Sequence, residues 1–596
     1  MDTPVPLNSR YSYHAIFSDI CKTRFNHLAT RLLLTLAVVF GLILALVSGS
    51  NQTNLIHKLF LWPVKCMVCY LGMLLVVVTR KNYLHVDFPG YSSIITQVYG
   101  QLFSVKLLVY FFIYSASSAC FNGAAGSAIL GHLSSRKNMF AYRFAIWILM
   151  PALYALQHVI FDLDKLSFQY GAQHQHPQRF ISSKIKNSLT KSFMLTLALA
   201  IIFPICTFHL APSTGYLSWM SFFHIQLSAL LTFALWDLVN LSFNAYLSMG
   251  CLHKGKPISS LSSTPMETLL TGLSSKRSFT KLTAFQELSY RATSPDIEAR
   301  LPIYHTRYKN VYVWPSVLKE CITTLNSTNS AVSIFMKSVE SKQELYTKKP
   351  SVDSDYLEDG TQQNDLFGND YVITANTQSR IPGTPQTQDS QLTHRIKVQN
   401  NNVFAKNHNL QFSSPFQFSN AANNRILTHQ TTITNIIYDC VKQAKDFFIA
   451  FFFPIQGTDA TAPLSSFEIW RISKKLQAER LSPLAVCHAE CTVSLMALLV
   501  KALQEDPKGA VVSSVGEILK ILERSVASLG AFAEWNTSSA SKDSSILDVV
   551  TILYDLSINA FLEIVLKYND LLSDVYLADD VVKLSKWMLE MCNEQA

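Results

Sequence analysis

Six long apolar runs in the first 250 residues constrain this chain more than any other feature. The hydrocarbon core of a bilayer is about 30 Å thick, so a helix needs roughly 20 residues to cross it. Runs of about that length lie at about 32–49, 59–79, 102–125, 140–161, 192–210 and 219–247. The sequence therefore predicts a six-span transmembrane helical bundle.

The charge distribution supports a membrane protein. The mean hydropathy is +0.19 and only 15% of the 596 residues are charged, which is too apolar for an ordinary soluble chain of this length. Residues 1–250 carry 17 Lys and Arg against 6 Asp and Glu, whereas the remainder carries 33 against 35. Because the excess positive charges flank apolar runs, they indicate membrane topology rather than nucleic-acid binding.

The positive residues also predict an orientation. Eleven Lys and Arg fall on the side that holds the N-terminus and the second and fourth loops, and three fall on the other side. We therefore expect both termini in the cytosol, with no cleavable signal peptide ahead of the first span. Asn51 begins a glycosylation sequon on the lumenal side, but it lies so close to the membrane that we expect little use.

A polar stripe interrupts the sixth apolar run. Asp237, Asn240 and Asn244 recur at helical spacing within it. Buried ionisable groups in a membrane are costly and often functional, so the stripe could be a transporter's substrate site. The alternative is hydrogen bonding between helices. We favour the alternative, because carriers usually show more buried charge or paired broken helices.

The chain changes character after residue 248, where helix signals of a soluble protein begin. Thr264 and Glu267 are spaced for a capping box, with Pro265 at the first helical position. Further helices are predicted at about 278–293, 314–325 and 331–346. Residues 347–425 are rich in Gln, Asn, Thr, Ser and Pro and predict a disordered linker.

An unusually aromatic helix is predicted after the linker, over about 431–453. Charged residues on this segment argue against a seventh span. It could pack in a protein core, which we slightly favour, or lie in the membrane interface. Its interface candidates are Phe447, Phe448, Phe451 and Phe452.

The fold class is therefore all-α. The predicted order is a cytosolic segment (1–31), a six-helix transmembrane domain (32–248), a first soluble helical segment (249–346), the linker (347–425) and a C-terminal α-helical domain (426–596).

Motifs for catalysis or cofactor binding are not found. Cys487, His488 and Cys491 lie close together, but zinc would need a fourth ligand at suitable spacing. Neither a P-loop, a Rossmann glycine pattern nor a G-x-S-x-G motif occurs. We therefore expect no enzyme, cofactor, metal or catalytic residue.

Several stretches carry a family resemblance. They include "YSYHAIFSDICKTRFNHLATRL" (11–32), "VTRKNYLHV" (78–86), "LQHVIFDLDKLSF" (156–168), "GCLHKGKPISSLSSTPMETLLTGLSS" (250–275) and "EDPKGAVVSSVGEILKILERSVASLGAFAEW" (505–535). In this order, they resemble fungal transmembrane nucleoporins of the nuclear-division-cycle type. Only the linker lies outside the resemblance.

The resemblance implies a nuclear-envelope scaffold with both termini facing the cytosol or nucleoplasm. Such proteins anchor the pore complex in the pore membrane, support its assembly and, in yeasts, help insert the spindle pole body. The implied partners are pore-membrane and linker nucleoporins, spindle-pole-body membrane factors and the bilayer, with no nucleic acid or small-molecule substrate. The alternative function is a polytopic transporter or lipid-modifying enzyme with a regulatory helical tail.

Overall fold

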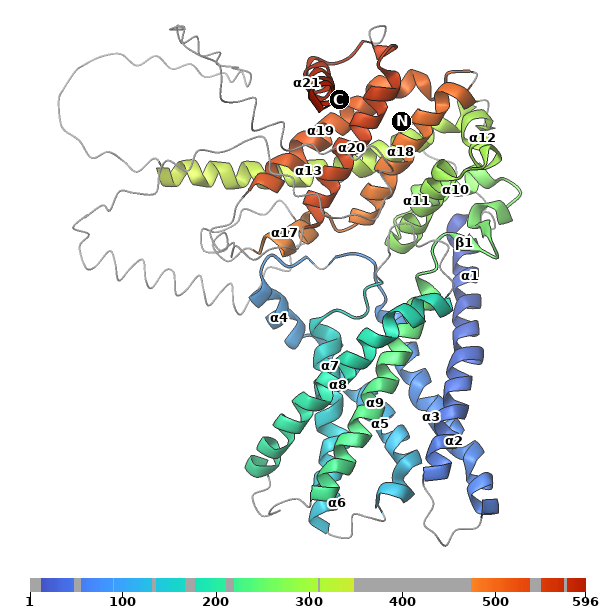
Figure 1. The fold of residues 1–596 in the computed structure, drawn as a ribbon, viewed down its shortest axis with the longest axis vertical. Coiled ribbons are helices and arrows are strands. Elements are labelled where there is room, and N and C mark those ends of the chain that lie inside the picture. The colour runs from blue at the N-terminus through green and yellow to red at the C-terminus, as the bar shows by residue number, and fades with distance from the viewer. Residues whose placement is uncertain are drawn as a thin grey trace, which may run out of the picture.

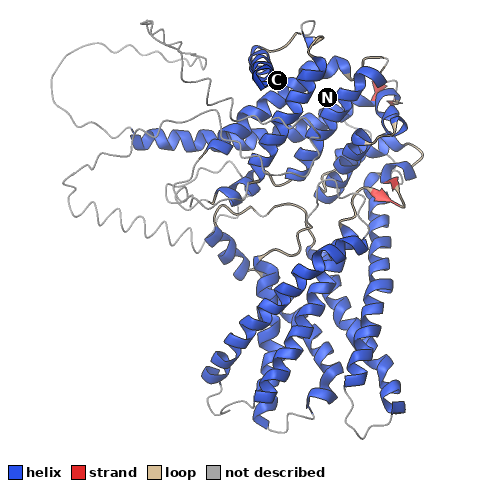
Figure 2. Cartoon of the chain, in the orientation of Figure 1, coloured by secondary structure: helices blue, strands red, loops and turns tan. Residues whose placement is uncertain are grey.

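The computed structural model shows a bundle of long helices below a second group of helices (Figure 1). It describes residues 12–47, 55–88, 90–130, 136–166, 177–210, 219–308, 311–347, 473–506, 508–535, 548–572 and 576–595. Almost all of the regular structure in these ranges is helical, as Figure 2 shows. The exceptions are two short antiparallel hairpins, β1 (Leu252–His253) with β2 (Lys256–Pro257), and β3 (Arg307–Tyr308) with β4 (Val311–Tyr312).

The lower bundle contains every predicted apolar run. Its first helix is continuous: α1 (Tyr13–His27) passes through the π-helical turn η2 (Leu28–Leu33) into α2 (Leu34–Val47). The other elements, in chain order, are α3 (Leu55–Tyr83), α4 (Ile94–Leu102), α5 (Val105–Leu130), α6 (Arg136–Phe144), η3 (Ala145–Leu149), α7 (Met150–Ile160), α8 (Pro177–Leu210) and α9 (Trp219–Leu247).

Large apolar side chains cover the outside of this bundle. Phe60, Phe112, Ile201 and Trp219 are each more than 60% exposed. A soluble protein would bury such side chains, whereas lipid solvates them. This exposure, together with helix length, confirms the predicted multi-span helical protein.

Eight described helices are long and apolar enough to cross a membrane, and two of them lie in the upper group. In α18 (Ala485–Glu505), 72% of the apolar window is buried inside the protein, against 17% in α8. Because α18 and α20 (Val549–Tyr568) contribute to a protein core, we assign the spans to the other six helices.

The upper group is a helical domain made from both sides of the predicted linker. Before the linker it contains η6 (Ile258–Leu261), α10 (Pro265–Leu273), α11 (Ser278–Thr293), α12 (Ile297–His305) and α13 (Val313–Thr347). After it come α17 (Lys474–Leu481), α18, η7 (Val512–Ser514), α19 (Val515–Glu534), α20 and α21 (Asp579–Gln595).

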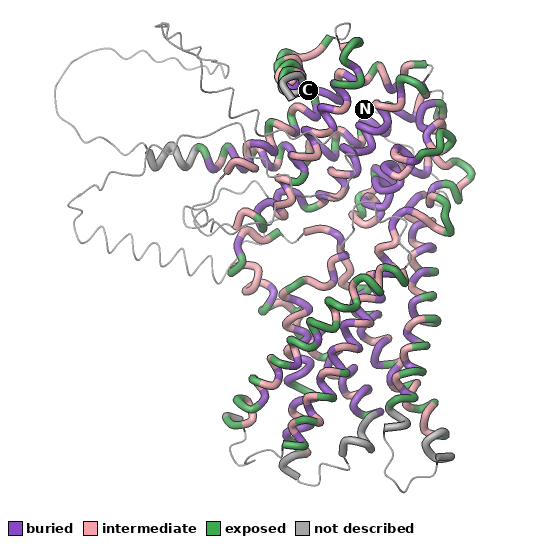
Figure 3. The backbone as a smooth tube through the Cα atoms, in the orientation of Figure 1, coloured by how far each residue is buried: buried purple, intermediate pink, exposed green. Residues whose placement is uncertain are grey.

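One hydrophobic core unites these two sets of helices. It includes Phe285 and Leu325 from the first set and Leu498, Leu522 and Phe561 from the second, all fully buried. Figure 3 shows this buried interior running through the upper domain. The two soluble segments that the sequence separates therefore fold as one unit.

Helix α1 belongs to the same core, although it continues into the first span. Tyr13 and Phe17 are buried against α10 and α11. Gly272 makes this approach possible, because a Cβ at that position would lie 2.7 Å from Cγ of Tyr13. Arg24 then donates hydrogen bonds to the carbonyls of Gly250 (3.0 Å) and Leu252 (2.8 Å), which holds α1 to the hairpin after α9.

Two local predictions were wrong. The helices predicted at 314–325 and 331–346 are one helix, α13, because its polar middle finds partners: Asn329 donates to Ser525 Oγ on α19 at 2.8 Å. The capping box of Thr264 and Glu267 does not form. Thr264 is the N-cap and Pro265 begins α10, but the Thr264 side chain makes no capping hydrogen bond.

Candidate functional site

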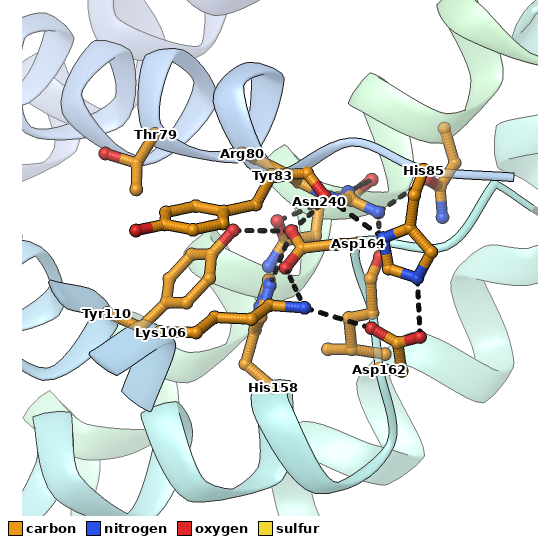
Figure 4. Close-up of polar contacts among 12 residues, drawn as sticks. Thr79, Arg80, Tyr83, His85, Lys106, Tyr110, His158, Asp162, Asp164 and Asn240 are labelled. Carbon is orange, nitrogen blue, oxygen red and sulfur yellow. Dashed lines mark hydrogen bonds and ion pairs between the residues drawn. The ribbon is translucent and has the colours of Figure 1, made fainter. Parts of the chain in front are cut away.

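The most concentrated polar site lies at the end of the membrane bundle that faces the upper domain. It forms where the loop after α7 meets the end of α3 and the residues that follow it (Figure 4). The amide of Leu166 donates to the carbonyl of His85 at 3.0 Å, which fixes the two segments side by side. We call this group of residues the junction cluster; it comprises Arg80, His85, Lys106, Tyr110, His158, Asp162, Asp164, Asn240 and Asn244.

Arg80 lies at the centre of the junction cluster and is fully buried. It donates to the carbonyl of Asn240 at 2.6 Å, to Asn240 Oδ1 at 3.3 Å and to Asn244 Oδ1 at 2.6 Å. It also donates to the carbonyl of Leu163. A guanidinium presents several donors in a fixed plane, so one side chain can join α3, α9 and the loop after α7.

Asp164 is the main counter-charge. Its carboxylate accepts from Tyr110 Oη (2.5 Å) and His158 Nε2 (3.0 Å), and lies 2.9 Å from Lys106 Nζ. Burial alone would raise the pKa of this carboxyl, but the hydrogen bond from His158 and the charge of Lys106 hold the pKa well below its usual range. Asp164 is therefore ionised and binds two helices, α5 and α7, to its loop.

Asp162, two residues earlier, extends the junction cluster outward. It pairs with Lys106 Nζ at 3.1 Å and with His85 Nε2 at 2.8 Å. Burial by itself would lower the pKa of His85, but the hydrogen bond and charge of Asp162 raise it above the ordinary value. Lys106 thus bridges two carboxylates, Asp162 and Asp164.

The predicted polar stripe on α9 lies directly below. Asp237 accepts from Tyr154 Oη (2.6 Å) on α7 and from Ser192 Oγ (2.5 Å) on α8. Asn240 donates to Tyr154 Oη at 2.9 Å. Each of Asp237, Asn240 and Asn244 therefore contacts a neighbouring helix or Arg80.

The junction cluster is arranged to hold segments together. Its cations and carboxylates pair with one another, and Tyr110, His85 and His158 are taken up in hydrogen bonds. Truncating one partner of such a buried group leaves the other charge uncompensated, which costs about 3–5 kcal/mol. The cluster thus fixes four spans, α3, α5, α7 and α9, and the loops that face the upper domain.

The cysteine-histidine group lies elsewhere, inside the core of the upper domain. Cys487, His488 and Cys491 are all fully buried on α18. Burial lowers the pKa of His488 to about 4, so its ring is neutral. Within the described ranges, no set of three or more His, Cys, Asp or Glu side chains is placed to hold a metal ion.

The aromatic candidates Phe447, Phe448, Phe451 and Phe452 lie outside the described residues, as does the predicted linker. Sequence reasoning found Asn240 and Asn244 of the junction cluster but missed its charged members, since it counted Arg80 only among the positive residues that mark topology. A signal was present: Asp162 and Asp164 are two of only six acidic residues in the first 250. Their closeness to a span end could have suggested a buried ion pair.

A comparison with protein families gives one match over most of the chain. The model of the family described as nucleoporin protein Ndc1-Nup matches residues 19–586. The matched region contains the junction cluster, the six spans and nearly all of the upper domain.

Proposed function

Since the chain belongs to the Ndc1-Nup family of nucleoporins and is a multi-span protein of the nuclear pore membrane, we propose that it is a scaffold that anchors the pore complex in that membrane. Its spans lie in the bilayer, and its helical domain presents surfaces that other proteins of the pore complex bind. It supports pore assembly, and it helps to insert the spindle pole body into the envelope.

The attachment of the upper domain to the first span carries this proposal. Helix α1 leaves the bilayer without a break and enters the core of the upper domain, where Tyr13 Oη donates to Glu287 at 3.1 Å. The amide of Phe88 also donates to the carbonyl of Pro483 at 3.1 Å, which gives a second attachment. A domain held at two points transmits load to the membrane, as an anchor must.

The proposed topology places both termini and the upper domain on the cytosolic or nucleoplasmic side. The excess of Lys and Arg at this end of the spans supports it. From that side, the proposed partners are other pore-membrane nucleoporins, linker nucleoporins and membrane factors of the spindle pole body. A glycosylation acceptor carried on a long flexible insert in residues 211–218, which places it clear of the membrane, should be modified, and the same insert at either terminus should not. The reverse pattern of modification would show that the chain has the opposite orientation in the membrane.

Depletion tests the scaffold role against the alternative of a transporter or lipid-modifying enzyme with a regulatory tail. Loss of the chain should lower the number of assembled pores and block spindle-pole insertion, and a full-length copy should restore both. Normal pores and insertion, combined with loss of a small-molecule flux or a change in lipid composition, would reject the scaffold. A tagged copy should give a punctate nuclear rim rather than a reticular or plasma-membrane signal.

A further inference from the structure

A cavity of about 630 Å³ lies beside the junction cluster, between the membrane bundle and the upper domain. Arg80, Asn240 and Asn244 line it from the spans, and Pro483 to Val486 line it from the segment before α18 and its first turn. Its volume is within the range of small-molecule sites, which is about 300–1,000 Å³. The cavity is not needed for anchoring, so it calls for a separate explanation.

Positive charge predominates in the wall of the cavity. Arg80, Lys165, Lys184 and Lys191 line it, against Asp162 and Asp237. Both carboxylates already accept hydrogen bonds, Asp162 from His85 and Lys106, and Asp237 from Tyr154 and Ser192. Within the described ranges, neither Lys184 nor Lys191 has an ion-pair partner. The unmatched cations would attract an anion.

Two cations in the wall, the buried Arg80 and the half-buried Lys165, point to the same conclusion. Arg80 is fully buried, yet its Nε–H has no hydrogen-bond acceptor among the described residues, the nearest carboxylate oxygen being Asp164 Oδ1 at 3.9 Å. Lys165 is withdrawn from water, which lowers the pKa of its ammonium to about 8 although Glu479 and Asp162 partly offset the effect. Lys165 Nζ lies over the ring of Phe88, which also lines the cavity. A bound anion would add an acceptor for Arg80 Nε and a counter-charge for Lys165.

The position of the cavity indicates where the anion comes from. On α8, Phe180, Lys184, Ser188 and Lys191 line the cavity at helical spacing. The lipid-facing part of the same helix begins at this level, with Leu189, Phe193, Met194, Leu197 and Ile201 exposed along it. A head group in the cavity could thus be followed by acyl chains along α8. Basic pockets between spans on the cytoplasmic side take anionic lipid head groups.

We propose that this cavity binds the phosphate-bearing head group of an anionic membrane phospholipid, with Lys165, Lys184 and Lys191 facing the phosphate and the acyl chains lying along α8. The bound lipid fills the space between the bundle and the segment before α18. It thereby attaches the upper domain to the bilayer itself.

The test uses the full-length chain in nanodiscs and in detergent, with phosphatidylserine and a phosphatidylinositol phosphate as probes. Either probe should raise the midpoint of thermal unfolding, and lipid should remain bound in native mass spectrometry, whereas phosphatidylcholine should do neither. The double variant K184Q/K191Q should weaken binding about thirtyfold, from about 1 kcal/mol for each lysine. The matched control R179Q/K186Q changes two exposed cations of α8 that do not line the cavity, and should weaken it little.

Two further measurements are needed. One distinguishes binding in the cavity from binding to surface charge, and the other distinguishes a membrane lipid from a soluble phosphate. Ser188→Phe keeps every charge but fills the cavity, so it should also weaken binding. Equal loss in R179Q/K186Q, or no loss in S188F, would overturn the site. Equal affinity for a water-soluble inositol phosphate would overturn the membrane lipid as its ligand. An unchanged lipid-free midpoint shows that each variant folds.

Discussion

Arg300 and Glu505 form a two-pronged ion pair that connects the helices before the predicted linker to those after it. Nη2 of Arg300 lies 2.6 Å from one carboxylate oxygen and Nε lies 2.8 Å from the other. Their side chains are only 3% and 12% exposed. Since α12 precedes the linker and α18 follows it, this pair fixes how the two halves of the domain meet.

Removing one partner should therefore destabilise the domain. Arg300→Met leaves the Glu505 charge buried and unpaired, which should cost about 3 kcal/mol and lower the midpoint of thermal unfolding. A double-mutant cycle with Glu505→Met should cost less than the sum of the two single changes. Lys583→Met, which breaks an exposed pair with Asp580, is the control and should change the midpoint little. Equal changes in the midpoint for Arg300→Met and the control Lys583→Met would contradict the assignment.

The contact between Gly272 and Tyr13 should be sensitive to a single methyl group. In Gly272→Ala, the new Cβ would meet the Tyr13 ring at 2.7 Å and Ala284 Cβ at 2.8 Å. We expect α1 to shift away from α10, with faster hydrogen exchange over residues 13–27. Gly123→Ala is the control, because its Cβ would meet nothing within 4 Å. Unchanged exchange in Gly272→Ala would show that α1 is not held by this contact.

Arg80 should not be replaceable by another cation. A lysine carries its three donors on a single nitrogen, whereas Arg80 reaches Asn240 with Nη1 and Asn244 and Leu163 with Nη2. Arg80→Lys and Arg80→Met should both lower the thermal midpoint in detergent, the second by roughly 3–5 kcal/mol of lost stability because Asp164 loses a buried counter-charge. Arg143→Met changes an exposed arginine of the same bundle and is the control. Full stability of Arg80→Lys would reject the role of the planar donor group.

Glu490 should make the upper domain less stable as the pH rises. Burial raises its pKa to about 7, partly offset by a hydrogen bond from Ser289, so the folded state favours the protonated carboxyl. The contribution of Glu490 to the free energy of unfolding is most favourable below the pKa of the unfolded state, about 4.5. As the pH rises from that value to 7, the protein loses up to about 3 kcal/mol of stability through this group. Glu490→Gln should therefore raise the midpoint at pH 8 more than at pH 5. Glu517→Gln, at an exposed site, should show no such difference.

The aromatic segment at 431–454 remains a prediction, with core packing and membrane docking still to be distinguished. A peptide covering Thr431–Pro454 should bind anionic liposomes if the segment docks on lipid, because its phenylalanines would enter the interface. Phe448→Asp or Phe452→Asp should then abolish binding. No binding by the unchanged peptide leaves the core interpretation.

The spans were predictable because the bilayer sets their length. A run such as 219–247 can only be a span or a deeply buried helix, and α9 covers it from Trp219 to Leu247. Length alone does not separate those two cases. Helix α18 also has the composition of a span. It is assigned to the protein core because it packs against α11, α13 and α20.

The junction cluster could not be predicted with the same ease. Whether Arg80 points to water or inward depends on Asp164 and Asn240, which lie 84 and 160 residues further on. Likewise, nothing local in residues 1–31 indicates that α1 packs on helices that follow the sixth span. Such contacts depend on the whole fold, and local patterns do not contain them.

The position of Tyr13 also sets an order of events during synthesis. Its partner Glu287 lies 274 residues along the chain, beyond all six spans. At about 5–20 residues per second, the ribosome takes on the order of tens of seconds to reach it. For that interval the first helix is made but its docking site is not, and the core stays incomplete until α18 to α20 emerge. Insertion into the membrane therefore precedes closure of the domain, and a chain that stops early presents an open apolar surface to the quality-control machinery.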